Sequence, residues 1–249
     1  MIVYLAGFKT IEKVYPFSTE DIYLLSSFFE HKGGKYGDYV KQDRHILDSG
    51  AFSTFKDIAA ARSMDWDLYV RKYIAFIKAT NQRLFFELDI DAVVGLPKVE
   101  QYRDQIAQAT GIAPIPCWHS NRKWDGWLKM CEEYPYVALG TTTATPDGVK
   151  MRKNPAILSQ FIKAAHDKKA KVHGLGFTSV EWLHRLKFDS VDSTTWNVGG
   201  KFGNVCLFDG VRDSKQWRPK GKMVRDTNAI NLFNFGEWVK FQRYAKDNL

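Results

Sequence analysis

Short runs of apolar residues alternate with longer amphipathic segments along most of this chain. The runs have the length of buried strands, and they occupy residues 2–6, 46–48, 84–90, 113–118, 136–141, 171–176 and 188–193. A further run at residues 205–208 is a possible eighth strand. Repeated strand and helix units indicate a mostly parallel sheet with helices covering it.

Two of the intervening segments show helical spacing most clearly. Residues 64–81 place apolar side chains on one helical face at Trp66, Tyr69, Val70, Tyr73, Ile74 and Ile77. Residues 154–169 repeat the pattern, with Pro155 near the start, where a helix tolerates proline.

The number of strands suits an α/β protein of the (β/α)8 TIM-barrel class, whose reactive groups lie where strands end and loops begin. An open, doubly wound sheet is the alternative, and the lack of a Gly-x-Gly-x-x-Gly turn after any early strand disfavours it. The length of 249 residues fits one barrel domain spanning residues 1–249. Residues 197–249 would supply a basic loop and a C-terminal helix that completes the barrel.

Charge and cysteine content narrow the class of protein. The 36 Lys and Arg residues exceed the 28 Asp and Glu residues by 8, which favours an anionic partner such as nucleic acid. The three cysteines are far apart and form no metal-binding pattern with histidine, so we expect a reducing compartment and no bound metal. Without a basic leader or a long apolar stretch, the sequence predicts a cytoplasmic protein with no membrane association.

Carboxylates gather at the ends of three predicted strands. Asp48 ends the first of them, and Asp189 and Asp192 surround the end of another. The third strand ends in "FFELDID", where Glu87, Asp89 and Asp91 alternate. In a barrel such ends converge on one mouth. An Asp at a strand end is equally often a cap of the following helix or turn, but the set favours a site.

Paired carboxylates in one pocket suit displacement at an anomeric carbon. One attacks or steadies the cationic sugar, and the other handles the proton of the leaving group. A third carboxylate could read a base, because it only accepts hydrogen bonds and so matches the N–H and amino edge of guanine. These steps require no cofactor and no metal.

Five motifs in order resemble the tRNA-guanine transglycosylases, and most closely their shorter phage-type relatives that exchange guanine for a 7-deazaguanine in DNA. The motifs are "LDSGAFSTF", "FELDID", "VALGTT", "HGLGFTS" and "FDSVDSTTW". They extend over residues 46 to 196. The resemblance implies that Asp48 is the general acid and base, that Phe52 stacks on the base and that Asp89 reads the guanine edge.

The resemblance also implies further residues of the base pocket. Ser49 lies beside Asp48 in the turn, and the backbone around Gly140 would line the pocket. His119, in "PIPCWHS", falls where the family has a polar side chain that touches the base, although a structural role is the simpler interpretation. Gly174 and Gly176 indicate a tight turn after a strand, where a ligand can approach the backbone.

Two residues compete for the role of nucleophile. Matching "FDS" to the family pattern selects Asp189, whereas matching "VDS" selects Asp192. We favour Asp192, because it lies nearer the C-terminal end of its predicted strand. Asp189 would then be a neighbouring acid that tunes Asp192, or a turn cap.

The chain departs from the tRNA enzymes in ways that change the expected substrate. It lacks their zinc-binding insertion, since Cys206 stands alone with no histidine beyond His184, and Ala51 replaces the second glycine of the turn. We therefore expect DNA and a free 7-deazaguanine such as preQ0 as substrates. The alternatives are a tRNA-guanine transglycosylase, a nucleoside or glycoside hydrolase with the same acids, and a DNA-binding module without activity.

A basic segment at residues 212–225 offers contacts to a nucleic-acid backbone. It interleaves cationic side chains with one aromatic stacking surface, at Lys215, Trp217, Arg218, Lys220, Lys222 and Arg225. A solvated basic loop is the competing interpretation of this run.

Overall fold

The computed structural model describes residues 1–17, 21–31, 40–51, 61–140, 146–177, 179–197, 204–210, 214–217 and 226–249. These residues form a mixed α/β fold with parallel strands. They divide into two compact units. Unit 1 contains residues 1–23 and 118–249, and unit 2 contains residues 24–117.

The strands of unit 1 form a parallel arrangement in the order β1-β7-β6-β5. Their bounds are β1 Ile2–Ala6, β5 Tyr136–Gly140, β6 Lys171–Leu175 and β7 Ser190–Ser193. All four confirm predicted strands. Because the strands are parallel, their C-terminal ends lie at one edge, where Gly140, Leu175 and Ser193 occur.

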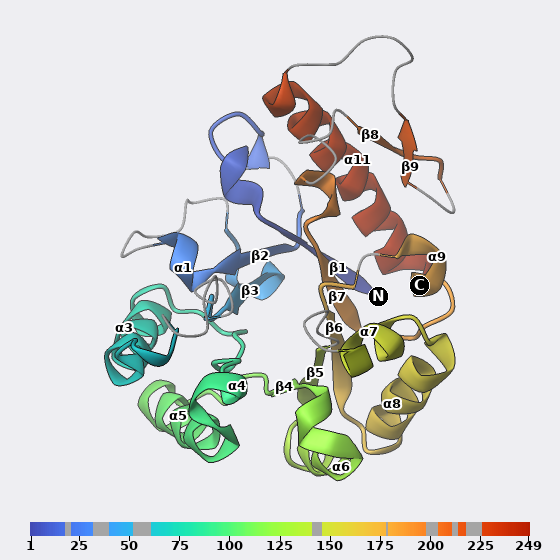
Figure 1. The fold of residues 1–249 in the computed structure, drawn as a ribbon. Coiled ribbons are helices and arrows are strands. Elements are labelled where there is room, and N and C mark those ends of the chain that lie inside the picture. Colours follow the sequence, from blue (N-terminus) through green and yellow to red (C-terminus); the bar gives the residue numbers. More distant parts are fainter. Residues whose placement is uncertain are drawn as a thin grey trace. The chain divides into compact units, whose positions relative to one another are not determined.

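Helices cover the strands of unit 1. They are α6 Lys123–Glu133, α7 Pro146–Arg152, α8 Pro155–Asp167, α9 Val180–Leu183 and α11 Thr227–Asn248, with short 3-10 turns η1 Phe8–Thr10 and η5 Ser120–Arg122. The predicted helix at residues 154–169 is confirmed as α8, and the Asn154 side chain caps it by accepting from the amides of Ala156 and Ile157. The long α11 runs beside β1 and β8 (Figure 1).

The predicted eighth strand has a different partner from the one expected. β8 (Val205–Phe208) pairs antiparallel with β9 (Ser214–Trp217) in a separate two-stranded sheet. The reason is visible on its other edge, where the amides of Cys206 and Phe208 donate to Asn234 Oδ1 at 2.7 Å and Glu237 Oε2 at 2.9 Å. Side chains of α11 therefore occupy the hydrogen-bonding positions that a parallel neighbour would need.

Unit 2 contains β2 Leu24–Ser27, α1 Phe28–His31, η3 Gln42–Arg44, β3 His45–Asp48, α3 Trp66–Ala79, α4 Asp91–Val94 and α5 Leu96–Thr110. β2 and β3 are parallel, with Ser27 opposite Asp48. β2 was not among the predicted strands. The predicted strand at 84–90 is reduced to bridges at Phe85 and Phe86, and β4 (Cys117–Trp118) is the short remainder of the strand expected at 113–118.

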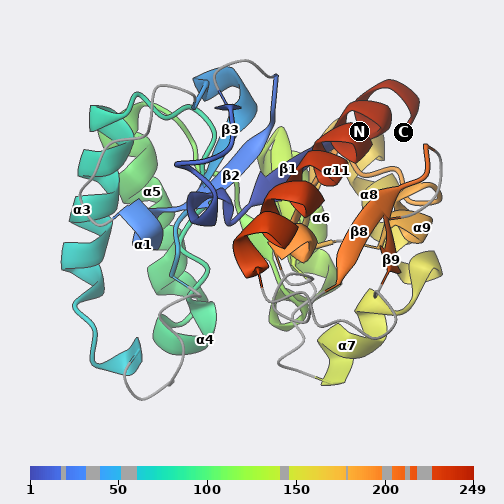
Figure 2. The same cartoon turned by 90° about the horizontal axis from the view of Figure 1, so that it is seen from above.

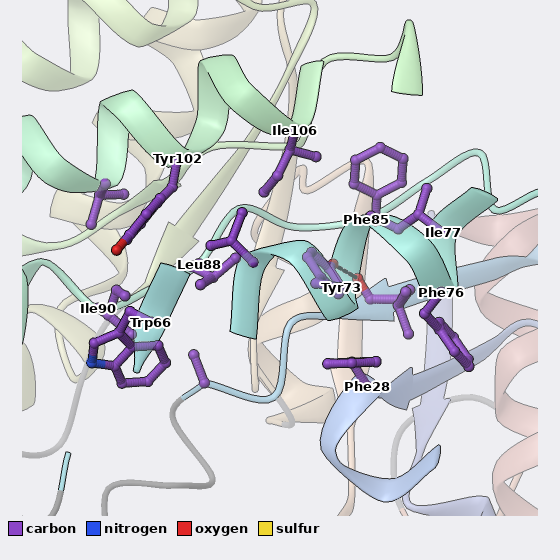
Figure 3. Packing of buried hydrophobic residues seen from close by; sticks show 14 of the residues in the cluster. Phe28, Trp66, Tyr73, Phe76, Ile77, Phe85, Leu88, Ile90, Tyr102 and Ile106 are labelled. Atoms are coloured by element: carbon purple, nitrogen blue, oxygen red, sulfur yellow. Dashed lines mark hydrogen bonds between the residues drawn. The ribbon is translucent and has the colours of Figure 1, made fainter. Parts of the chain in front are cut away.

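The core of unit 2 follows from the helical spacing in residues 64–81, which confirms the predicted helix. Asp65 caps α3 by accepting from the Leu68 amide at 2.8 Å. Trp66, Val70 and Tyr73 then face inward, where α3 lies beside α5 (Figure 2). Figure 3 shows Tyr73 packed with Phe28 and Phe85, and the Trp66 ring at the other side of the cluster, near Ile90. This core holds the end of β3, and with it Asp48, in a fixed place.

Candidate functional site

One face of the unit 1 sheet carries nearly all of its polar side chains. Neighbouring strands place paired residues on the same face, so the register puts His173 in line with Ala138 and Ser190, and Tyr4 in line with Asp192. The opposite face presents the fully buried Val3, Val137, Val172 and Val191, which form apolar core. Because successive side chains point to opposite sides of each strand, the sheet has one polar face and one apolar face that forms part of the core.

Asp192 lies at the C-terminal end of β7, and its carboxylate is held through a single oxygen. Oδ1 accepts from the Gly176 amide at 2.6 Å and lies 3.3 Å from His173 Nε2. Oδ2 has no hydrogen-bond partner among the described residues, and the side chain retains 14% of its exposure. One oxygen is thus restrained, while the other remains available to a substrate.

A guanidinium lies close to this carboxylate. Arg152, the last residue of α7, donates to the Gly176 carbonyl and approaches the Phe177 ring with its Cζ 5.7 Å from the centroid. Burial lowers the pKa of Arg152, and the nearby Asp192 charge acts in the opposite direction. Arg152 therefore places positive charge beside Asp192 and also fixes the turn that supplies the Gly176 amide.

Two glycines, one inside β6 and one in the turn after it, have different roles. Gly176 has φ +60°, in the left-handed region that favours glycine. Gly174 lies inside β6, on the face opposite His173, and a Cβ there would be 3.0 Å from the Phe188 ring. Of the two glycines named from the sequence, Gly176 forms the turn, and Gly174 makes room for the aromatic core.

His119 and Gly140, both predicted as base-pocket residues, lie against each other in unit 1. A Cβ at Gly140 would be 2.7 Å from His119 Nδ1 and 2.9 Å from the Trp118 carbonyl oxygen. Gly140 also belongs to the face that carries His173 and Asp192. The absence of a side chain at Gly140 thus allows the His119 imidazole to lie at the C-terminal end of β5.

Asp189, the competing nucleophile, has a different environment from Asp192. It precedes β7 and therefore lies at the N-terminal end of the strand. Its Oδ2 accepts from the Val172 amide at 2.7 Å and lies 2.9 Å from His166 Nε2. Asp189 therefore links β7 to β6 and α8, at the end of the strand opposite Asp192.

In unit 2, Asp48 is the last residue of β3 and Ser49 follows it directly, as predicted. The Ser49 carbonyl accepts from the Tyr69 hydroxyl at 2.6 Å, and burial together with the Asp48 charge raises the pKa of Tyr69. Gly50 turns the chain at φ +69°, where a Cβ would lie 2.7 Å from the Phe29 amide nitrogen. Contacts to α3 and α1 therefore fix the turn that directly follows the half-buried Asp48.

The three acids of "FFELDID" have three different environments. Glu87 is fully buried, where it pairs with Arg103 at 3.0 Å and accepts from the Cys117 amide at 2.8 Å. Asp91 begins α4, where an acid is favourable next to the helix dipole. Asp89 lies between them and is partly exposed. Glu87 and Asp91 therefore have structural roles, and Asp89 is the partly exposed acid between them.

Several predicted residues fall outside the described part of the chain. These are Phe52, Arg218, Lys220, Lys222 and Arg225. Lys215 and Trp217 belong to β9, for which the backbone alone is described. The predicted stacking surface and basic segment therefore stay predictions.

Sequence reasoning missed His173, Ser190, Tyr136 and Arg152. The first three share a sheet face with Asp192, and the signal for them is the polar alternation in "KVHGL" and "SVDS". Arg152 had no such signal, because its position depends on how α7 packs.

Among the described residues, no cluster of His, Cys, Asp and Glu has the arrangement of a metal site. None of the described helices combines the length and the apolar character needed to span a bilayer. A scan against profiles of protein families and a search of curated proteins both found no match to this chain.

Proposed function

We propose that this protein is a guanine transglycosylase that exchanges guanine in DNA for a 7-deazaguanine base such as preQ0. The observation that carries the proposal is the Asp192 carboxylate, which lies at the C-terminal end of a parallel strand, is restrained through Oδ1 by two donors and has the Arg152 guanidinium nearby. This is the arrangement that a nucleophile at an anomeric carbon needs. We also propose that the parallel strands belong to a TIM-type barrel, whose reactive groups lie at strand C-termini.

The proposed reaction is a double displacement. Asp192 Oδ2 bonds to C1′ while the C1′–N9 bond breaks, and the bonding pair leaves with guanine, which Asp48 protonates. The incoming 7-deazaguanine then attacks C1′, the ester C–O bond breaks, and Asp48 takes up the proton that the new base releases. Because the base must leave the stack to be exchanged, the substrate nucleotide is flipped out or single-stranded.

The individual residues support these roles by their surroundings. Two donors hold Asp192 Oδ1, and the Arg152 guanidinium lies near enough to interact with its charge. His119 over Gly140 and the partly exposed Asp89 are the proposed contacts to the base.

The test is an exchange assay on DNA and tRNA side by side, with a labelled 7-deazaguanine. Label should enter guanine-containing DNA, and a covalent adduct of protein and DNA should be trapped. Asp192→Asn should abolish both, whereas the matched variant Asp189→Asn should retain them.

Other outcomes would replace the proposal. Label entering tRNA alone would indicate the tRNA enzyme, and release of guanine without an acceptor base would indicate a hydrolase. If Asp189→Asn abolishes the adduct and Asp192→Asn does not, Asp189 is the nucleophile. DNA binding without any turnover would leave only a binding module.

A further inference from the structure

Four polar side chains of unit 1 form one continuous chain of hydrogen bonds that ends at Asp192. The Tyr136 hydroxyl contacts Ser190 Oγ, and Ser190 Oγ lies 2.6 Å from His173 Nδ1. His173 Nε2 completes the chain at 3.3 Å from Asp192 Oδ1. The four residues come from β5, β6 and β7, so the register of the sheet alone brings them together.

The chain lies deep in the protein. His173 is 0% exposed and Ser190 is 1% exposed. Serine, histidine and aspartate together resemble a hydrolytic triad in composition, but the Ser190 hydroxyl is too deeply buried to meet a substrate. Both ends of the chain, Tyr136 and Asp192, are partly exposed, and the Asp192 end lies at the C-terminal end of β7, so the chain can act on that carboxylate.

Every donor and acceptor in the chain is paired if each hydrogen bond is donated in the direction from Tyr136 toward Asp192. An ionised Asp192 only accepts, so His173 donates from Nε2, and a neutral imidazole must then accept at Nδ1. Ser190 donates to that nitrogen and accepts from the Tyr136 hydroxyl. Burial raises the pKa of Tyr136 to about 12, which keeps its phenol protonated and able to donate.

We propose that His173 is a positioning residue for Asp192, held in the Nε2–H tautomer by Ser190 and Tyr136. Together with the Gly176 amide, it places two donors on Oδ1 and so turns Oδ2 toward the substrate. The effect of His173 on catalysis rests on the proposed function, whereas the tautomer of His173 does not. Among the described residues, the Arg152 guanidinium lies near Asp192, and the Tyr4 and Tyr136 rings lie 6.1 and 6.5 Å from the His173 ring by their centroids.

The tautomer can be measured without any substrate. Two-dimensional ¹⁵N–¹H correlation spectra of the histidine rings, recorded at neutral pH, should show His173 as neutral and protonated on Nε2. The His173→Gln variant assigns the signal. Ser190→Ala should shift the Nδ1 resonance, because that nitrogen loses its donor. A ring protonated on Nδ1 or on both nitrogens would overturn the proposal.

Kinetics test the positioning itself. His173→Leu should slow formation of the covalent adduct by about tenfold or more, because Oδ1 loses a charge-assisted donor. His173→Gln should recover most of that rate, since its amide can donate in place of Nε2–H. The matched control is His166→Gln, which changes a half-exposed histidine on α8 and should leave the rate unchanged.

The outcomes separate the two proposals. Equal loss of rate in folded His173→Leu and His173→Gln proteins, or no loss in either, contradicts the positioning role. Absence of any adduct with the unmodified protein contradicts the proposed transglycosylase, and the tautomer measurement then still decides the hydrogen-bond chain.

Discussion

Asp189 and Asp192 are separated by the first two residues of β7, and their carboxylates have different partners. Asp189 accepts from the Val172 amide and pairs with His166, which ties strand to helix. Asp192 is likewise held through one oxygen, but its donors are the Gly176 amide and His173, and the cationic Arg152 lies near it. The difference arises because the two residues lie at opposite ends of β7, so they meet different neighbours.

Also at the scale of a residue, His45 is expected to make stability depend on pH. Burial lowers its pKa from 6.5 to about 4, and the ring lies within hydrogen-bonding distance of Ser26 and Gln82. The unfolded chain binds a proton near pH 6.5, which the folded chain resists. Stability should therefore decrease as pH falls below 6.5, by about 2 kcal/mol between pH 7 and pH 5.

Urea unfolding at the two pH values measures this change. His45→Gln should flatten the dependence, because the neutral amide does not titrate. Lys129→Gln, on the exposed face of α6, is the control and should keep the slope of the unmodified protein. An identical slope in His45→Gln and the unmodified protein would show that His45 is not the source.

At the scale of elements, a buried ion pair joins the segment between α3 and α4 to α5. Glu87 is 0% exposed, and its carboxylate meets both Arg103 and the Cys117 amide. The carboxylate therefore carries one contact to a helix and one to the next strand. Such a pair holds elements of unit 2 together, and this role does not require either charged group to contact a ligand.

Removing the cation of this pair should be costly. Arg103→Met leaves the Glu87 charge buried without its guanidinium, and we expect a loss of about 3–5 kcal/mol in the free energy of unfolding. The control is Lys163→Met, which removes the exposed ion pair with Asp167 and should cost less than about 1 kcal/mol. Similar losses in both variants would contradict a structural role for the buried pair.

At the scale of the whole molecule, α11 connects the two ends of the chain within unit 1. The Met1 amine donates to the Ala245 carbonyl at 3.1 Å, and the Gln242 amide donates to the Val3 carbonyl at 2.6 Å and the Tyr23 carbonyl at 2.8 Å. Gln242 Oε1 also accepts from the Tyr23 amide at 3.0 Å. The C-terminal helix therefore belongs to the same folded unit as the first strand.

The net charge of +8 is also a property of the whole molecule, and it predicts salt-dependent binding to DNA. Each phosphate contact contributes about 0.9 to the slope of log affinity against log salt concentration. Neutralising Lys220 and Lys222 together should therefore reduce the slope by up to about 1.8 if both contact phosphates. Fluorescence anisotropy over a salt series measures it.

The matched control neutralises Lys129 and Lys163, which lie on the exposed faces of α6 and α8. An equal effect of both double variants would show that binding depends on total charge and not on the basic segment.

The sequence predicted helices and strands well where apolar residues recurred at helical spacing or formed a clear short run. α3 and α8 followed from helical spacing, and β1, β5, β6 and β7 from short apolar runs. β2 was missed, and β8 was assigned to the wrong kind of sheet. Both errors concern short segments, where the choice of strand partner depends on residues far away in the sequence.

By itself, the sequence determined which segments are apolar enough to become buried strands and where acids follow them, because both depend on residue type and spacing along the chain. It left open which groups hold the Asp189 and Asp192 carboxylates, and it did not indicate the His173 chain. The tertiary structure decided these points. Parallel register aligns Tyr136, His173, Ser190 and Asp192 across three strands. Hydrogen bonds between strands are set by pairing over long separations, which no local pattern records.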